Sequence, residues 1–253
     1  MKIWIKGEGE PIVGIVGCLH GNETLGKEVI GCLYNIEPKK GTILYIVANE
    51  EAMAEQRRFI DVDLNRCFPG ACTGTHEEKL ATTLLKELAE CDYVLDIHST
   101  TADTENFIII TRNNLATRTL ASFIPLNKVV FMGKTIAKGK ALIDHVSCGV
   151  SLECNANTPV ASVEKLVISC LIRLGVLQGV APTLSQEYYY VYGILKRYKE
   201  TRMLENFKQS NIGGELFYPI LFGEKEYKDI ICFKSKKKLL LSQDESLSFN
   251  LIN

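Results

Sequence analysis

Runs of apolar, β-branched residues alternate with segments of helical periodicity through the first 180 residues of the chain. The apolar runs predict buried strands over residues 11–17, 42–48, 93–97, 107–111, 129–132 and 150–152. Helical spacing of apolar residues predicts helices over 24–34, 75–90 and 160–177, and Thr75 with Glu78 forms a capping pair for the second of them. Strands that alternate with helices are typical of an α/β fold. We therefore expect a mixed, mostly parallel sheet that is flanked by helices.

The pattern changes after Gly179, Ala181 and Pro182, which interrupt the regular elements. Residues 187–199 and 214–240 are rich in tyrosine, lysine and β-branched residues, with turn-forming residues between them. We therefore expect two domains, a larger α/β domain over residues 1–181 and a small β-rich C-terminal domain over residues 182–253.

The composition is that of an ordinary globular protein, with 46% hydrophobic residues, 23% charged residues and a formal net charge of -1. So small a net charge gives no field that would attract nucleic acid or an anionic membrane. No apolar run reaches the roughly 18 residues that cross a bilayer, and no signal peptide is visible. We expect a cytoplasmic protein with neither nucleic acid nor membrane as a partner. The nine cysteines lack C-x-x-C spacing and are expected to be reduced and mostly structural.

Residues 21–27 (GNETLGK) resemble a phosphate-binding P-loop, because they follow a predicted strand and precede a predicted helix. Two features oppose this interpretation. Position 28 is a glutamate where the motif needs a hydroxyl group, and Glu23 would place a carboxylate beside anionic phosphates. A nucleotide-binding protein is therefore kept only as an alternative.

Two predicted strands end in residues that commonly bind metals. His20 and Glu23 follow the first buried strand, and His98 follows the strand over 93–97. Because sites in open α/β sheets lie outside the carboxyl ends of strands, these side chains can meet there. Two imidazoles and a carboxylate form one of the usual catalytic zinc sites. Asp96 is either an acceptor that orients an imidazole or an ordinary polar residue at a strand end, and histidines at strand ends are commonly plain surface residues.

The flanking sequences strengthen the metal-site interpretation. CLHGNETLG, RFIDVDLNR, DIHSTT and SLEC occur in this order, and residues 218–233 continue the likeness. Together they resemble the succinylglutamate desuccinylase and aspartoacylase family, a branch of the zinc carboxypeptidase superfamily. The resemblance implies a zinc-carboxypeptidase-like fold in which one zinc ion per chain is held by His20, Glu23 and His98.

The resemblance also implies roles for five further residues. Arg58 would polarise the substrate carbonyl, and Glu153 would act as the general base. Asn65 and Arg66 would bind a substrate carboxylate, and Tyr227 would contact the substrate. The residues themselves leave structural alternatives open: a solvated loop for Glu153, a turn for Asn65, an ion pair with Asp63 for Arg66, and simple packing for Tyr227.

The chain departs from the family pattern in one place. Aspartoacylases carry an arginine about ten residues before the catalytic glutamate, whereas the segment from Lys138 to Glu153 contains none. Lys138 and Lys140 are the nearest cations in this segment, but a lysine lacks the planar fork that grips a carboxylate. The acyl group and the amino acid of the substrate are therefore left open.

These features favour a zinc-dependent hydrolase that cleaves the amide bond of an N-acyl amino acid or a similar small carboxylate substrate. A metallocarboxypeptidase that acts on peptides uses the same chemistry and is the first alternative. A non-catalytic zinc protein is the second, although it would not need Glu153 and Arg58. The sequence leaves a homo-oligomer open.

Overall fold

The computed structural model describes residues 1–133, 137–196 and 203–241, with the side chains of residues 239–241 left out. Within this part of the chain eleven strands form one sheet in the order β1-β3-β2-β4-β7-β5-β6-β8-β11-β10-β9. The strands are β1 Lys2–Glu8, β2 Ile12–Gly17, β3 Gly41–Val47, β4 Tyr93–Thr100, β5 Phe107–Ile110, β6 Lys128–Phe131, β7 Gly149–Asn155, β8 Gln186–Lys196, β9 Ser210–Ile212, β10 Glu215–Ile220 and β11 Ile230–Leu241.

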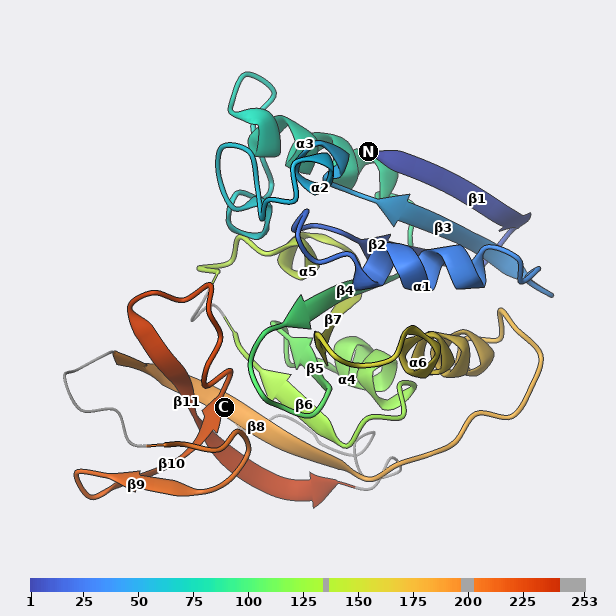
Figure 1. Cartoon of the computed structure of the whole chain (residues 1–253). Helices are drawn as coiled ribbons and strands as arrows, with labels where there is room; N and C mark the ends of the chain where they lie inside the picture. Colours follow the sequence, from blue (N-terminus) through green and yellow to red (C-terminus); the bar gives the residue numbers. More distant parts are fainter. Residues whose placement is uncertain (134–136, 197–202, 242–253) are drawn as a thin grey trace.

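The sheet is mixed, and parallel pairing dominates its first part. β3, β2, β4 and β7 are parallel neighbours, as are β5 with β6 and β6 with β8. β1 and the strands beyond β8 pair antiparallel. Figure 1 shows the C-terminal strands, in orange and red, gathered at the end of the sheet opposite the blue β1. The predicted fold class is confirmed.

Helices cover both faces of the sheet. The α-helices are α1 Leu25–Leu33, α2 Glu50–Ala54, α3 His76–Glu87, α4 Leu115–Ser122, α5 Leu142–His145 and α6 Val160–Arg173, with a short 3-10 helix η1 at Leu64–Arg66. The adjacent residues Ile15 and Val16 of β2 belong to opposite cores, because successive side chains of a strand point to opposite faces. Ile15 packs in the core that contains α1, α4 and α6 residues, and Val16 packs with α3 and α5 residues.

The predicted helices are present with slightly shorter bounds, and the capping box of Thr75 and Glu78 opens α3 as expected. Three short helices with four to eight residues, α2, α4 and α5, were not predicted from the sequence. Short helices carry too few turns for a clear apolar periodicity. Within the described residues no helix combines the length and apolar character that crossing a membrane requires.

The C-terminal strands continue the main sheet, because β8 pairs with β6 on one side and with β11 on the other. The division into domains at residue 182 stays a prediction. Residues 197–199 of the first predicted β-rich segment and residues 242–253 of the predicted second domain lie outside the described part of the chain.

Candidate metal and substrate site

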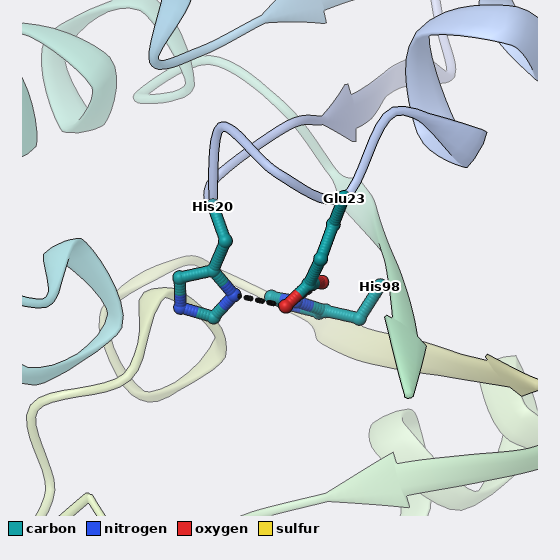
Figure 2. A group of neighbouring side chains, drawn as sticks. All are labelled: His20, Glu23 and His98. Atoms are coloured by element: carbon teal, nitrogen blue, oxygen red, sulfur yellow. Dashed lines mark hydrogen bonds and ion pairs between the residues drawn. The ribbon is translucent and has the colours of Figure 1, made fainter. Parts of the chain in front are cut away.

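The three expected metal ligands meet beside the carboxyl ends of β2 and β4. Figure 2 shows His20 and Glu23 on the loop after β2 and His98 on β4, with the side chains turned toward one another. The Nδ1 atoms of His20 and His98 lie 2.7 and 3.0 Å from the two carboxylate oxygens of Glu23. One ligand atom from each side chain lies within 4.8 Å of the other two. Such a cluster is compact enough for a single ion.

The loop that carries Glu23 owes its shape to close packing of glycines rather than to phosphate binding. A Cβ atom added to Gly26 would lie 2.7 Å from Gly17 Cα, and one added to Gly21 would lie 2.2 Å from the carbonyl carbon of Ala52. Contacts this short are possible only without a side chain, so these glycines let α1 approach β2 and let the loop approach α2. Two of the glycines in the P-loop-like pattern therefore have a packing role.

Each imidazole also meets a second carboxylate through its other nitrogen. The Nε2 atom of His20 lies 3.1 Å from Asp63 Oδ1, and the Nε2 atom of His98 lies 2.7 Å from Asp96 Oδ2. Carboxylates in this position fix the tautomer and orientation of histidines that bind metals. The structure thus places Asp96 in the orienting position that the sequence allowed, and it places Asp63 in the same position beside His20.

The charge balance of this cluster suits a cation. Burial alone would lower the pKa values of both imidazoles, but the neighbouring carboxylates outweigh it: Glu23 and Asp63 raise the pKa of His20, and Asp96 and Glu23 raise that of His98. Burial would raise the pKa of Glu23, but the two imidazoles hold it well below its usual range. Buried carboxylates that need positive partners, together with two Nδ1 atoms aimed at one carboxylate, fit a divalent metal of the zinc type.

Arg58 contacts the same cluster. Its guanidinium Nη1 lies 3.0 Å from Glu23 Oε1, and its Nη2 lies 3.2 Å from Asp63 Oδ2. An ion pair between Arg66 and Asp63 was one alternative from the sequence, whereas in the structure the guanidinium group that donates hydrogen bonds to Asp63 is that of Arg58. Arg58 and Asp63 are five residues apart in the sequence, and both reach the metal cluster, since Asp63 contacts His20 and Arg58 contacts Glu23.

Glu153 stands beside the metal cluster on the neighbouring strand. It is the register partner of His98 in the parallel pair of β4 and β7. Both residues lie inside their strands and not after them, because the ladder continues for two residues beyond each. Burial, with further contributions from the charges of Glu23 and Glu224 against an opposing one from His98, raises the pKa of Glu153 to about 8. A carboxyl group whose pKa lies so close to neutral pH is suited to proton transfer.

The expected substrate-binding residues line the same pocket. Asn65 and Arg66 belong to η1, and Tyr227 lies in the loop between β10 and β11. Asn65 Oδ1 accepts a hydrogen bond of 2.9 Å from Leu142 N, so its amide nitrogen is the group left for a ligand. The Tyr227 ring packs edge-on against Phe233 at 5.4 Å between centroids. All eight residues singled out from the sequence therefore line one pocket.

Two acidic residues that support or line the site were not singled out from the sequence. Glu77 is fully buried on α3 and accepts hydrogen bonds from the backbone of residues 60–62, which lie in the loop between Arg58 and Asp63. Glu224 lines the pocket and binds the end of β4 through Thr100 and Thr101. Both are acidic residues far in sequence from their partners, and a single glutamate among thirty acidic residues carries no local signal.

The fold and the site together define an α/β protein with a candidate His-Glu-His metal centre. The family model of the succinylglutamate desuccinylase/aspartoacylase catalytic domain matches residues 10–140. The chain belongs to the succinylglutamate desuccinylase/aspartoacylase family.

Individual relatives match over shorter parts. A probable aspartoacylase of Acaryochloris marina is 32% identical over 131 residues, which are 44% of this chain and 42% of the relative. An N-acyl-aromatic-L-amino acid amidohydrolase (carboxylate-forming) B of Danio rerio is 28% identical over 110 residues, 36% of this chain and 35% of the relative. The matched part of the chain thus spans less than half the length of these relatives.

Solved structures share the fold over nearly the whole chain. Murine aminoacylase 3 superposes with a TM-score of 0.72 at 20% identity, over 92% of this chain and 100% of that one. A succinylglutamate desuccinylase/aspartoacylase from Rhodobacter sphaeroides gives a TM-score of 0.70 at 17% identity, over 94% of this chain and 89% of that one. At these identities the likeness establishes the fold.

Proposed function

We propose that the chain is a zinc-dependent amidohydrolase that removes the acyl group of an N-acyl amino acid. The observation that carries the proposal is that the candidate metal cluster, Glu153, Asn65 and Arg66 line one pocket. The family membership and the relatives named aspartoacylase, desuccinylase and aminoacylase support it. The proposal includes a cytoplasmic location, which the nine free cysteines support.

His20, Glu23 and His98 would hold one zinc ion per chain. When bound, zinc supplies a Lewis acid that activates water at neutral pH and polarises a carbonyl group. Asp63 and Asp96 keep the outer Nε2 nitrogens occupied, so that both imidazoles present Nδ1 to the ion.

Glu153 would move the proton. Its carboxylate takes a proton from the attacking water and passes it to the amide nitrogen, which leaves as a free amine. Burial raises the pKa of Glu153 toward neutral pH, which favours a group that first accepts a proton and then donates it.

Positive and neutral donors would hold the substrate. The Arg58 guanidinium is the donor for the developing oxyanion, and a fixed donor of this kind contributes about 3 to 4 kcal/mol. Arg66 and the Asn65 amide would bind the carboxylate. Burial raises the pKa of Tyr227 to about 12, so its hydroxyl stays protonated and can donate.

The test compares zinc content and hydrolysis of N-acetyl amino acids in the wild type, Glu153→Gln and the control Glu90→Gln, which changes an exposed glutamate after α3. We expect about one zinc per chain in all three. Hydrolysis should fall by about 100-fold or more in Glu153→Gln alone. Equal activity in all three would remove Glu153 from the mechanism. Zinc binding without hydrolysis would favour a non-catalytic zinc protein, and cleavage of peptides alone would favour a carboxypeptidase.

A further inference from the structure

One side of the pocket is apolar. The metal cluster and Arg58 form its charged side, at the ends of β2 and β4. Across β7, the wall is built from residues of β5, α5 and the segments after β6 and β10. Its apolar members are Ile109, Met132, Ala137, Ala141, Ile143 and Leu221. Neighbouring strands lie about 4.8 Å apart, and β5 is two strands from β4 in the sheet. Ile109, the member of the apolar wall on β5, thus lies on a strand about 10 Å across the sheet from the strand that carries His98.

This apolar wall is a packed surface and not a set of isolated side chains. Ala137, Ala141 and Ile143 form one hydrophobic cluster, against which Ile109 packs. Met132 and Leu221 belong to another buried cluster, which contains Phe107 and Phe233. Because these side chains are held by their own cores, the wall is preformed for an apolar group.

The carboxylate-binding pair adjoins this wall. The hydrogen bond from Leu142 N to Asn65 Oδ1 fixes η1 to the first turn of α5, directly beside Ala141 and Ile143. A substrate carboxylate held by Asn65 and Arg66 therefore brings the carbon that bears it close to the apolar wall. The amino-acid side chain is attached to that same carbon, so it is the part of the substrate that reaches the wall.

Among the residues that the structure describes, the pocket offers no cation for a second carboxylate. Arg58 and Arg66 are the only lysine or arginine side chains that line it within the described residues. Ile143 stands ten residues before Glu153 and lines the pocket with an apolar side chain. Lys138 and Lys140 do not line the pocket, and the electrostatic neighbours of Lys140 are Cys67 and Glu78, outside it.

Charge elsewhere in the pocket also opposes an acidic side chain. Glu224 and Glu226 line the pocket and would repel a second carboxylate. Burying a charge without a partner costs free energy. Burying an apolar side chain against Ile143 and Met132 is favourable, because it removes apolar surface from water.

Building on the proposed function, we infer that the chain acts on N-acyl derivatives of amino acids with apolar side chains, and that Ile109, Met132, Ile143 and Leu221 select them. The wild-type protein should prefer N-acetyl-leucine and N-acetyl-phenylalanine to N-acetyl-aspartate by about 100-fold or more in kcat/KM. Calorimetric binding of N-acetyl-leucine and N-acetyl-aspartate to Glu153→Gln measures the same preference without hydrolysis.

Two variants assign the preference to the wall. Ile143→Arg should lower the leucine-to-aspartate ratio by at least about 10-fold. The control Ile5→Arg makes the same change at a residue of β1 that is 63% exposed and should leave the ratio as it is. Because Ile143 is buried and its arginine variant can fail to fold, Met132→Ala provides a second measurement. It should lower the ratio of N-acetyl-leucine to N-acetyl-alanine by about 10-fold.

The outcomes separate the inference from the function on which it rests. Hydrolysis that favours N-acetyl-aspartate or N-succinyl-glutamate overturns the apolar subsite and leaves the deacylase proposal intact. If Lys134→Gln removes such a preference for acidic substrates, the apolar subsite is overturned in the same way. The cation that binds the second carboxylate is then Lys134, which lies outside the described part of the chain. Preferential binding of N-acetyl-leucine with hydrolysis of no substrate supports the subsite and refutes the deacylase. Ratios unchanged in both wall variants would also overturn the subsite.

Discussion

Replacement of Glu77 by glutamine tests how the loop that carries Arg58 is held. Glu77 Oε1 accepts hydrogen bonds from Ile60 N at 2.6 Å and Asn49 Nδ2 at 3.0 Å. Glu77 Oε2 accepts from Asp61 N at 2.9 Å and Val62 N at 3.2 Å. Glutamine keeps only one of the two oxygens. Two of the four donors would then face an NH₂ group, which is itself a donor and cannot accept from them.

The expected cost follows from these two lost bonds. A hydrogen bond to a charged group is worth about 1.5 to 3 kcal/mol, so the two lost bonds of Glu77→Gln should lower the free energy of unfolding by about 3 to 6 kcal/mol. The neighbouring variant Glu78→Gln is the matched control. Glu78 closes the capping box with Thr75, a position where glutamine also serves, so we expect a much smaller loss of stability than for Glu77→Gln.

The pH dependence of this difference has a definite sign. Burial alone would raise the pKa of Glu77, but hydrogen bonds from the backbone of residues 60–62 and from Asn49 outweigh it and lower the pKa below its usual value. A carboxyl group whose pKa is lowered by folding stabilises the protein above its unfolded pKa of about 4.3, and this stabilisation is lost as the pH falls through the folded value. The difference in the free energy of unfolding between wild type and Glu77→Gln should therefore be largest at neutral pH and should decrease in acid.

Guanidinium denaturation, monitored by circular dichroism, measures the free energy of unfolding of both variants. A zinc titration measures their affinity for the metal. Because the loop positions Asp63 against His20, Glu77→Gln should also lower zinc affinity by about 10- to 100-fold, whereas Glu78→Gln should not. Equal unfolding midpoints for the two variants at neutral pH would refute the reasoning.

Three further predictions concern the metal site and its supporting helix. Asp96→Asn should lower zinc affinity by about 10- to 100-fold, measured by competition with a chromogenic chelator, because His98 loses the carboxylate on Nε2; an unchanged affinity would contradict this role. Gly26→Ala should destabilise the protein by about 1 to 3 kcal/mol in thermal melts, because its Cβ would meet the backbone of β2. Gly31→Ala on the same helix meets nothing within 4 Å and should be stabilising by about 0.5 to 1 kcal/mol, so equal effects at the two glycines would contradict the packing argument.

The main strands and the longer helices could be predicted because their signals are local. The sequences of β2, β3 and β4 are short, apolar and rich in β-branched residues. The start of α3 is marked by the capping box of Thr75 and Glu78. The shorter α5 had no such signal, and its place became clear only through the hydrogen bond to Asn65. That contact spans 77 residues of sequence, so no local pattern could reveal it.

The site divides in the same way. The residue types of His20, Glu23 and His98, together with the sequences that flank them, predicted a metal cluster, and the structure brings the three side chains together. That Arg58 is the guanidinium partner of Asp63 was not predictable. This contact depends on the conformation of the loop after Arg58, which hydrogen bonds to Glu77 hold in place.

By itself the sequence determined the α/β alternation, the residues able to hold a metal and the absence of an arginine between Lys138 and Glu153. These depend on residue identity and on periodicities of two and 3.6 residues, which are fixed before the chain folds. Only the tertiary structure decided what stands in place of the arginine, because the pocket wall is assembled from β5, α5 and two connecting segments that are distant in sequence. The position of each charge relative to its partners was likewise set by the pairing of strands, since burial and distance determine whether a carboxylate binds, orients or repels.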